Sequence, residues 1–170
     1  MFNIRKAEIK DIPAIAKVHV RTWQVHYRGQ MPDEYLDNLS VQEKTDKWQK
    51  NLASLKSNES VFVLEDLDQI LGFCWVGPSR DDKDEDDSGS LYAIYVLPDN
   101  QGKGFGSALM KVGLDFLRSQ GFIRATLWVL KSNITSIKFY ESQGWKFDGA
   151  ELDDQRDGFV LHEIRYGLDL

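Results

Sequence analysis

Cysteine is almost absent from this sequence, since Cys74 is the only one among 170 residues. No disulfide can form within the chain, which fits a reducing compartment, and the apolar surroundings of Cys74 predict a buried, unreactive thiol. Long apolar runs are also missing. No stretch approaches the roughly 20 residues of a membrane helix, and the N-terminal residues lack the apolar core of a secretion signal. These absences predict a cytoplasmic protein without a membrane partner.

Positive charge is in deficit, with 21 Lys and Arg residues against 27 Asp and Glu residues and a net charge of −6. Binding to nucleic acid needs a basic surface, so this balance argues against a nucleic-acid partner. The three histidines and the single cysteine show no metal-ligand spacing, and we predict no metal site. His19 lies on an apolar helix face and is expected to be a packed side chain.

The length suits one domain, residues 1–170, with a substantial core. Helical and strand-like periodicities both occur, which predicts a layered α/β or α+β domain with helices packed on one mixed sheet. The expected strands cover residues 2–7, 60–65, 70–76, 91–98, 124–130, 145–148 and 159–168. The expected helices follow Asp11 and Ser40 or cover residues 32–39, 107–117 and 133–144. The polar residues 80–90 and 149–158 are expected to be loops.

The most informative segment is a glycine-rich stretch, residues 101–106, between a strand-like run and an amphipathic helical segment. Strand, glycine loop and helix together aim backbone N–H groups at an anion, and Lys103 adds a positive charge. A dinucleotide-binding loop is excluded because Ser107 or Leu109 stands where its third glycine is needed. A nucleoside-triphosphate loop is excluded because Gly104 follows Lys103 where Ser or Thr is needed. A different phosphate-bearing ligand is therefore favoured over a simple turn.

A second motif covers residues 133–145, one helix and one strand further along. With both motifs, the chain resembles the GCN5-related N-acetyltransferase (GNAT) family. The phosphate loop of that family is Gln/Arg-x-x-Gly-x-Gly/Ala, and its second motif is Asn-x-x-Ala-x-x-Phe/Leu-Tyr-x-x-x-Gly-Phe. The matching residues are Gln101, Gly104, Gly106, Asn133, Phe139, Tyr140 and Gly144. The departures are mild, with Ser136 in place of Ala and Trp145 in place of Phe.

The resemblance implies a GNAT-like fold, in which a mixed, mostly antiparallel sheet carries helices on both faces. The sheet would be splayed between the strand ending near Val96 and the strand ending near Leu130, with acetyl-CoA in the gap as acetyl donor. The backbone around Tyr95 and Val96 would pair with the pantetheine arm and stabilise the oxyanion. The implied cofactor-binding residues are Ile94, Tyr95, Val96, Gln101, Gly102, Lys103, Gly104, Phe105, Gly106, Ser107, Asn133, Ser136 and Tyr140.

Tyr140 is the catalytic acid that the resemblance implies, with the departing thiolate of CoA as its proton acceptor. It lies seven residues after Asn133, about two helical turns, so the two share a helix face. The alternative for Tyr140 is a core aromatic. A base is also needed, because an alkyl amine with a pKa near ~10 must lose a proton before it attacks. The residues that remain open for this role are Glu65, His162, Glu163, His26 and Tyr27.

The acceptor is expected near residues 18–36, where the family varies, with Trp23, His26 and Tyr27 as substrate contacts. This segment resembles a bacterial GNAT subgroup that includes polyamine acetyltransferases. Residues 81–87 hold six acidic side chains and one lysine. Such a run is typical of a solvated loop, but over the cleft it would attract a cationic amine.

The sequence therefore predicts an acetyl-CoA-dependent N-acetyltransferase that acts on a primary amine of a small molecule such as a polyamine. Two alternatives remain. One is an acetyltransferase of a protein N-terminus or lysine, and the other is an inactive acyl-CoA-binding domain with a regulatory role. The sequence leaves open whether the protein forms a homodimer.

Overall fold

The structure is a computed structural model that describes residues 1–81, 84–156 and 158–170. Its strands are β1 (Asn3–Lys6), β2 (Ser60–Asp66), β3 (Gln69–Pro78), β4 (Ser88–Val96), β5 (Arg124–Leu130), β6 (Lys146–Arg156) and β7 (Phe159–Asp169). The α-helices are α1 (Ile12–His26), α2 (Asp33–Asp37), α3 (Val41–Ala53), α4 (Phe105–Ser119) and α5 (Ile134–Ser142). No helix among the described residues is long and apolar enough to cross a membrane.

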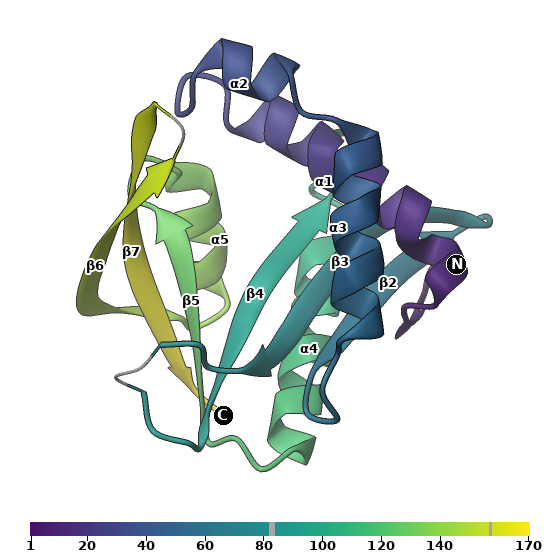
Figure 1. Cartoon of the computed structure of the whole chain (residues 1–170). Helices are drawn as coiled ribbons and strands as arrows, with labels where there is room; N and C mark the ends of the chain where they lie inside the picture. Colours follow the sequence, from purple (N-terminus) through teal and green to yellow (C-terminus); the bar gives the residue numbers. More distant parts are fainter. Residues whose placement is uncertain (82–83, 157) are drawn as a thin grey trace.

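The strands form one sheet in the order β1-β2-β3-β4-β5-β7-β6, and only β4 and β5 run parallel. These two pair over a short stretch, residues 88–90 against residues 124–126. Beyond it they diverge, so that the sheet opens into two halves (Figure 1). The expected mostly antiparallel sheet, splayed between these two strands, is confirmed.

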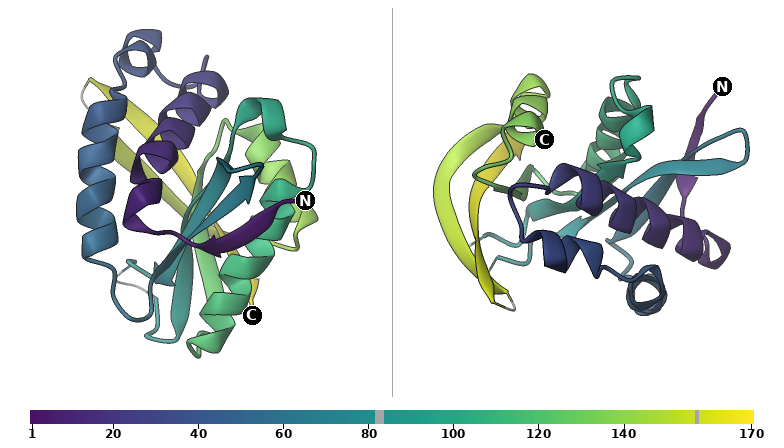
Figure 2. Two further views of the ribbon diagram at one scale, coloured as in Figure 1. Left: turned by 90° about the vertical axis from the view of Figure 1, so that its right-hand side faces the viewer. Right: turned by 90° about the horizontal axis from the view of Figure 1, so that it is seen from above.

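Helices cover both faces of the sheet (Figure 2). On one face α1 and α3 enclose a core that includes Ile15, Trp48 and Phe73, and on the other face α4 packs on β2, β3 and β4 through residues such as Leu109 and Leu117. Helix α3 begins as its sequence predicts, because the Ser40 hydroxyl accepts a hydrogen bond from the Glu43 N–H at 3.2 Å. These two layers hold the half-sheet that carries β4.

Two expected loops contain strand residues. Strand β6 continues through Arg156, so the expectation of a loop over residues 149–158 is wrong for most of that segment. It is an edge strand with mostly exposed side chains, and it therefore lacks the apolar alternation that marks a half-buried strand. Strand β4 likewise begins at Ser88, inside the loop expected over residues 80–90. Its first residues are small and polar, so they carry no apolar signal.

Candidate functional site

A cleft of about 1170 Å³ lies where the two half-sheets separate. Helices α4 and α5 line it from one face of the sheet, and α1 lines it from the other. Nearly all of the implied cofactor and acceptor residues line it: Trp23, His26, Tyr27, Ile94, Tyr95, Val96, Gln101, Gly102, Gly104, Phe105, Gly106, Ser107, Asn133, Ser136 and Tyr140. Lys103 is exposed and is not among the lining residues.

The glycine loop ends at the N-terminus of α4. Gly102 and Gly104 have φ values of +73° and +81°, a region that residues with a Cβ rarely adopt. A Cβ at either position would meet no protein atom within 4 Å, so this side of the loop is open to a ligand. Gly104 is the N-cap and has no side chain to satisfy the first N–H groups of the helix. These donors are available to an anion in the cleft.

Three contacts fix the position of this loop. The Gln101 amide donates a hydrogen bond to the Val96 carbonyl at 3.1 Å and lies 2.5 Å from Nε2 of His26 on α1. Burial lowers the pKa of His26, which keeps its Nε2 free to accept this hydrogen bond. Gly106 packs closely under α5, because a Cβ there would lie 3.2 Å from the Phe139 ring. The loop is therefore tied to three elements around the cleft.

Asn133 has a structural role as the N-cap of α5. Its Oδ1 accepts a hydrogen bond from the Ser136 N–H at 3.2 Å, and its side chain is buried. This bond explains why an Asn starts the helix. The side-chain N–H₂ group makes no hydrogen bond to another described residue, so it remains available to a ligand in the cleft.

Tyr140 lies on α5 with its ring between Phe139 and Trp145. The ring is packed as a core aromatic would be, yet the side chain also lines the cleft. Its hydroxyl makes no hydrogen bond to another described residue. Burial, and then the neighbouring Tyr95, raises the pKa of Tyr140 above its usual range. Tyr140 is therefore protonated at neutral pH, as a proton donor must be.

The structure separates the candidates for the base. Glu65 lies in an ion-pair network, with its carboxylate 2.8 Å from the guanidinium of Arg5. His162 is exposed and lies 2.6 Å from the carboxylate of Asp153. Glu163, on β7, is the one carboxylate of this set that lines the cleft. Burial, and then Asp154, raises the pKa of Glu163, while Arg156 lowers it.

Comparison with known proteins agrees with this geometry. Residues 17–145 match the model of the "Acetyltransferase (GNAT) family". The chain belongs to the GNAT family. It is 39% identical to the "Uncharacterized N-acetyltransferase YuaI" of Bacillus subtilis over 84% of this chain and 79% of that protein. It is also 31% identical to the mycothiol acetyltransferase of Saccharopolyspora erythraea, over 77% of this chain but only 39% of that longer protein.

Solved structures share the fold over nearly the full length. The PaiA N-acetyltransferase of Thermoplasma acidophilum, determined with coenzyme A, has a TM-score of 0.77 at 19% identity and covers 100% of this chain and 99% of its own. The ribosomal-protein-alanine N-acetyltransferase of Brucella melitensis has a TM-score of 0.76 at 23% identity, covering 99% of both chains. This GNAT protein thus belongs to a family of acyltransferase enzymes.

On the acceptor side of this GNAT cleft, aromatic side chains from two elements meet. Trp23 comes from α1 and Tyr27 directly follows this helix, with their rings 5.2 Å apart, and Tyr95 comes from β4. Burial, and then Tyr95 and Tyr140, raises the pKa of Tyr27. With its pKa raised, Tyr27 is a poor base at neutral pH. Nε2 of His26 is engaged by the Gln101 amide, so Glu163 is the better candidate of the cleft residues.

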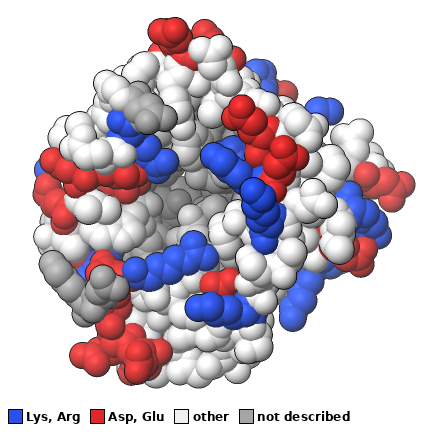
Figure 3. Space-filling view, viewed as in Figure 1, with Lys and Arg blue, Asp and Glu red and all other residues white. Residues whose placement is uncertain are grey.

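Several lining residues were not found from the sequence, among them Arg80, Trp128, Arg156 and Arg165. Arg80 and Arg156 lie near the ends of segments that the sequence predicted as loops. A loop has no periodic pattern from which the side that a side chain faces could be predicted. Figure 3 shows Lys and Arg side chains around the hollow at the centre of this face. The rim is therefore partly cationic, although the net charge of the chain is negative.

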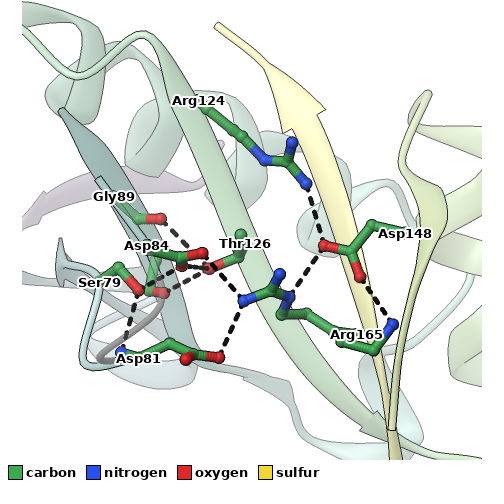
Figure 4. A network of polar contacts seen from close by, with 10 residues as sticks. Ser79, Asp81, Asp84, Gly89, Arg124, Thr126, Asp148 and Arg165 are labelled. Atoms are coloured by element: carbon green, nitrogen blue, oxygen red, sulfur yellow. Dashed lines mark hydrogen bonds and ion pairs between the residues drawn. The ribbon is translucent and has the colours of Figure 1, made fainter. Parts of the chain in front are cut away.

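The acidic run at 81–87 is partly bound into the structure (Figure 4). The guanidinium of Arg165 on β7 lies 2.8 Å from Asp81, 2.9 Å from Asp84 and 2.8 Å from Asp148 on β6. Of the described acids in the run, only Asp81 lines the cleft. Asp82 and Lys83 lie outside the described residues. Two of the six charges are thus compensated by an arginine.

Metal binding receives no support from the described part of the chain. No group of three or more His, Cys, Asp or Glu side chains is placed there to hold an ion. Cys74 is fully buried, and burial raises the pKa of its thiol to about 12. Its thiol is thus protonated at neutral pH, so it is neither a thiolate ligand nor a nucleophile.

Proposed function

We propose that this protein transfers the acetyl group of acetyl-CoA to the primary amine of a small molecule in the cytoplasm. The observation that carries the proposal is the opening between β4 and β5, which joins the glycine loop, Tyr140 and Glu163 in one cleft. The membership of the chain in the GNAT family supports the same reaction. A binding protein would not need a protonated tyrosine and a carboxylate on either side of the gap.

The glycine loop would hold the pyrophosphate of the cofactor. Its positive-φ glycines leave room for the phosphates, and the first N–H groups of α4 supply donors. Beyond Ser90, β4 has no pairing with β5, so the backbone of residues 91–96 offers unpaired groups along that edge. The pantetheine arm can pair with them as a strand would. This arrangement brings the thioester close to Tyr95 and Tyr140.

The proposed chemistry needs proton transfers at the acceptor nitrogen and at the departing thiolate. Glu163 takes a proton from the ammonium form of the acceptor, directly or through a water molecule, and leaves a neutral amine. The amine nitrogen attacks the thioester carbon, and a β4 N–H stabilises the oxyanion that forms. When the C–S bond breaks, Tyr140 donates its proton to the thiolate, and the acetylated nitrogen loses its extra proton to the resulting tyrosinate, directly or through a water molecule. The products are the N-acetylated amine and CoA.

The acceptor could belong to one of several classes. A polyamine was suggested by the acidic run, but of its described acids only Asp81 lines the cleft, and Asp81 and Asp84 both pair with Arg165. A protein N-terminus or lysine, and an inactive acyl-CoA-binding domain, are the other candidates. A panel of amines that includes spermidine, amino acids and short peptides separates them.

The decisive experiment measures acetyl transfer by mass spectrometry of the products and by release of the CoA thiol. We expect Tyr140→Phe to lose roughly 10²–10⁴-fold in turnover, the scale of general acid catalysis. Its affinity for CoA, measured by calorimetry, should change little because the ring and its packing remain. Turnover at the parent rate would assign Tyr140 to the core alone. A protein that binds CoA but acetylates no amine in the panel would favour the regulatory alternative.

A further inference from the structure

A side pocket of about 190 Å³ adjoins the acceptor end of the cleft. It lies between α1, α3 and the strands β3 and β4, on the face opposite α4 and α5. Trp23, Tyr92 and Tyr95 line both this pocket and the main cleft, so the two spaces share walls. Its volume admits an acidic group with the carbon atoms attached to it, since one water molecule takes about 30 Å³ in the liquid.

Positive charge gathers at this pocket. Lys44 and Lys47, one turn apart on α3, both line it, and Lys44 lies 5.2 Å over the Trp23 ring. Neither lysine forms an ion pair with a described carboxylate. Burial lowers the pKa of Lys44, and the charges of Lys47 and Arg156 lower it further, while Glu43 raises it. An anion placed here would relieve this repulsion.

Besides Nε1 of Trp23, two further buried N–H donors at the same pocket have no acceptor among the described residues. Nδ1 of His19 accepts a hydrogen bond from the Trp48 indole at 3.1 Å. Burial, with Lys44 and Lys47, lowers the pKa of His19 to about 3, so the ring is neutral and its proton is on Nε2. Nε2 of His19 and Nε1 of Trp75 are both buried without a hydrogen-bond partner among the described residues. Buried donors are usually paired, so an acceptor is missing here.

The remaining walls are mostly aromatic, with Asn51 as a further polar side chain. The rings of Trp75 and Tyr92 pack edge to face at 5.1 Å, and Tyr95 and Trp23 continue this wall toward the main cleft. Other charges nearby are already compensated: Arg80 lies 3.5 Å from Glu59 and stacks over the Tyr92 ring, and Arg156 lies 2.7 Å from Asp154. Lys44 and Lys47 are therefore the charges at this pocket without an ion-pair partner among the described residues.

We propose that the acceptor of this enzyme is a primary amine that also carries a carboxylate, joined to it by a flat apolar body. The side pocket binds the carboxylate through Lys44, Lys47 and the two unpaired N–H donors, while the amine reaches Glu163 in the cleft. This inference rests on the proposed acetyl transfer. A polyamine fits this pocket poorly, because its second ammonium group would lie beside Lys44.

The test uses two matched acceptors, 4-(aminomethyl)benzoate and 4-(aminomethyl)benzamide, which share the amine, the ring and the length. We expect kcat/KM to favour the carboxylate by at least ~10-fold, equivalent to about 1.4 kcal/mol. In the double variant Lys44→Gln, Lys47→Gln this preference should fall to near unity, with the KM for acetyl-CoA unchanged. Lys50→Gln is the matched control, since it is an exposed lysine of α3 outside both pockets.

Calorimetric binding of the benzoate in the presence of CoA separates failure of this inference from failure of the proposed function. Equal use of both acceptors by the parent protein would overturn the inference while acetyl transfer stands. A carboxylate preference that survives in the folded double variant would also overturn it. Benzoate binding that is lost in the double variant, without any acetylation, would support the pocket and contradict the proposed reaction.

Discussion

One physical cause would suit Tyr140 and Glu163 to the opposite roles proposed for them. Burial disfavours the charged form of each and raises both pKa values. For a phenol this keeps the proton in place, ready for a thiolate. For a carboxylate it makes the anion less stable and therefore a stronger base. The pair face the same cleft from α5 and β7.

The role of Glu163 can be tested at the level of this single residue. Glu163→Gln keeps the shape but removes the base, so we expect turnover to fall by roughly 10²-fold or more. In the parent protein, kcat/KM should fall on acidification around the raised pKa of Glu163, above the ordinary 4.5 of a glutamate. This fall of kcat/KM at low pH should be absent from the Glu163→Gln variant.

The stability of the Glu163→Gln variant should not fall along with its turnover. Because the folded state raises the pKa of Glu163, its stabilising contribution is complete below the unfolded-state pKa and is lost as the pH rises through the folded-state value. Replacing the charge by an amide should therefore not lower the free energy of unfolding at pH 7, as measured in urea. A variant with both low turnover and low stability would indicate a structural role instead.

At the scale of elements, the N-terminus of α4 is the proposed binding site for the phosphates of CoA. Gly104→Asp adds a negative charge where the pyrophosphate is expected, and we predict that CoA affinity falls more than ten-fold, or more than ~1.4 kcal/mol. Any side chain at φ +81° is strained, so the control is Gly104→Asn, which has the same shape, no charge and a tolerance for this backbone region.

Calorimetry with CoA measures both variants after circular dichroism has shown that they are folded. The asparagine variant should lose much less affinity than the aspartate variant. Equal affinity of the two variants would mean that charge at this loop does not matter, and would place the phosphates elsewhere.

At the scale of the whole molecule, the two half-sheets meet over only a short parallel stretch of β4 and β5. The Arg165 network spans this joint, because it ties β7 to the connection before β4 (Figure 4). Arg165 and its partner Asp84 are largely buried, with exposed fractions of 14% and 9%. Loss of one partner from such a network leaves partly buried charges that are neither paired nor well hydrated.

We expect Arg165→Met to lower the free energy of unfolding by roughly 2–4 kcal/mol, somewhat less than the loss from a fully buried ion pair. Urea denaturation measures the change. The matched control is Arg118→Met, because Arg118 pairs on the surface with Asp115 and such pairs contribute less than ~1 kcal/mol. Equal stability of the two variants would mean that the network does not hold the joint.

Local sequence patterns determined much of this protein. The Ser40 cap, the glycine loop before α4 and the Asn133 motif all depend on residues a few positions apart, and their geometry follows from backbone chemistry. The same motifs indicated the GNAT family, and the family resemblance in turn predicted the splayed sheet. The sequence also predicted His19 as a packed ring, because its neighbours on the helix face are apolar.

The tertiary structure decided what depends on residues far apart in the chain. It placed Glu163 in the cleft, extended β6 through a polar segment, and joined Arg165 to acids about 80 positions away. It also brought Lys44, His19 and Trp75 to one pocket from three elements. No local sequence pattern encodes these tertiary contacts. Burial and unpaired charge are properties of the packed chain, not of residues that are neighbours in sequence.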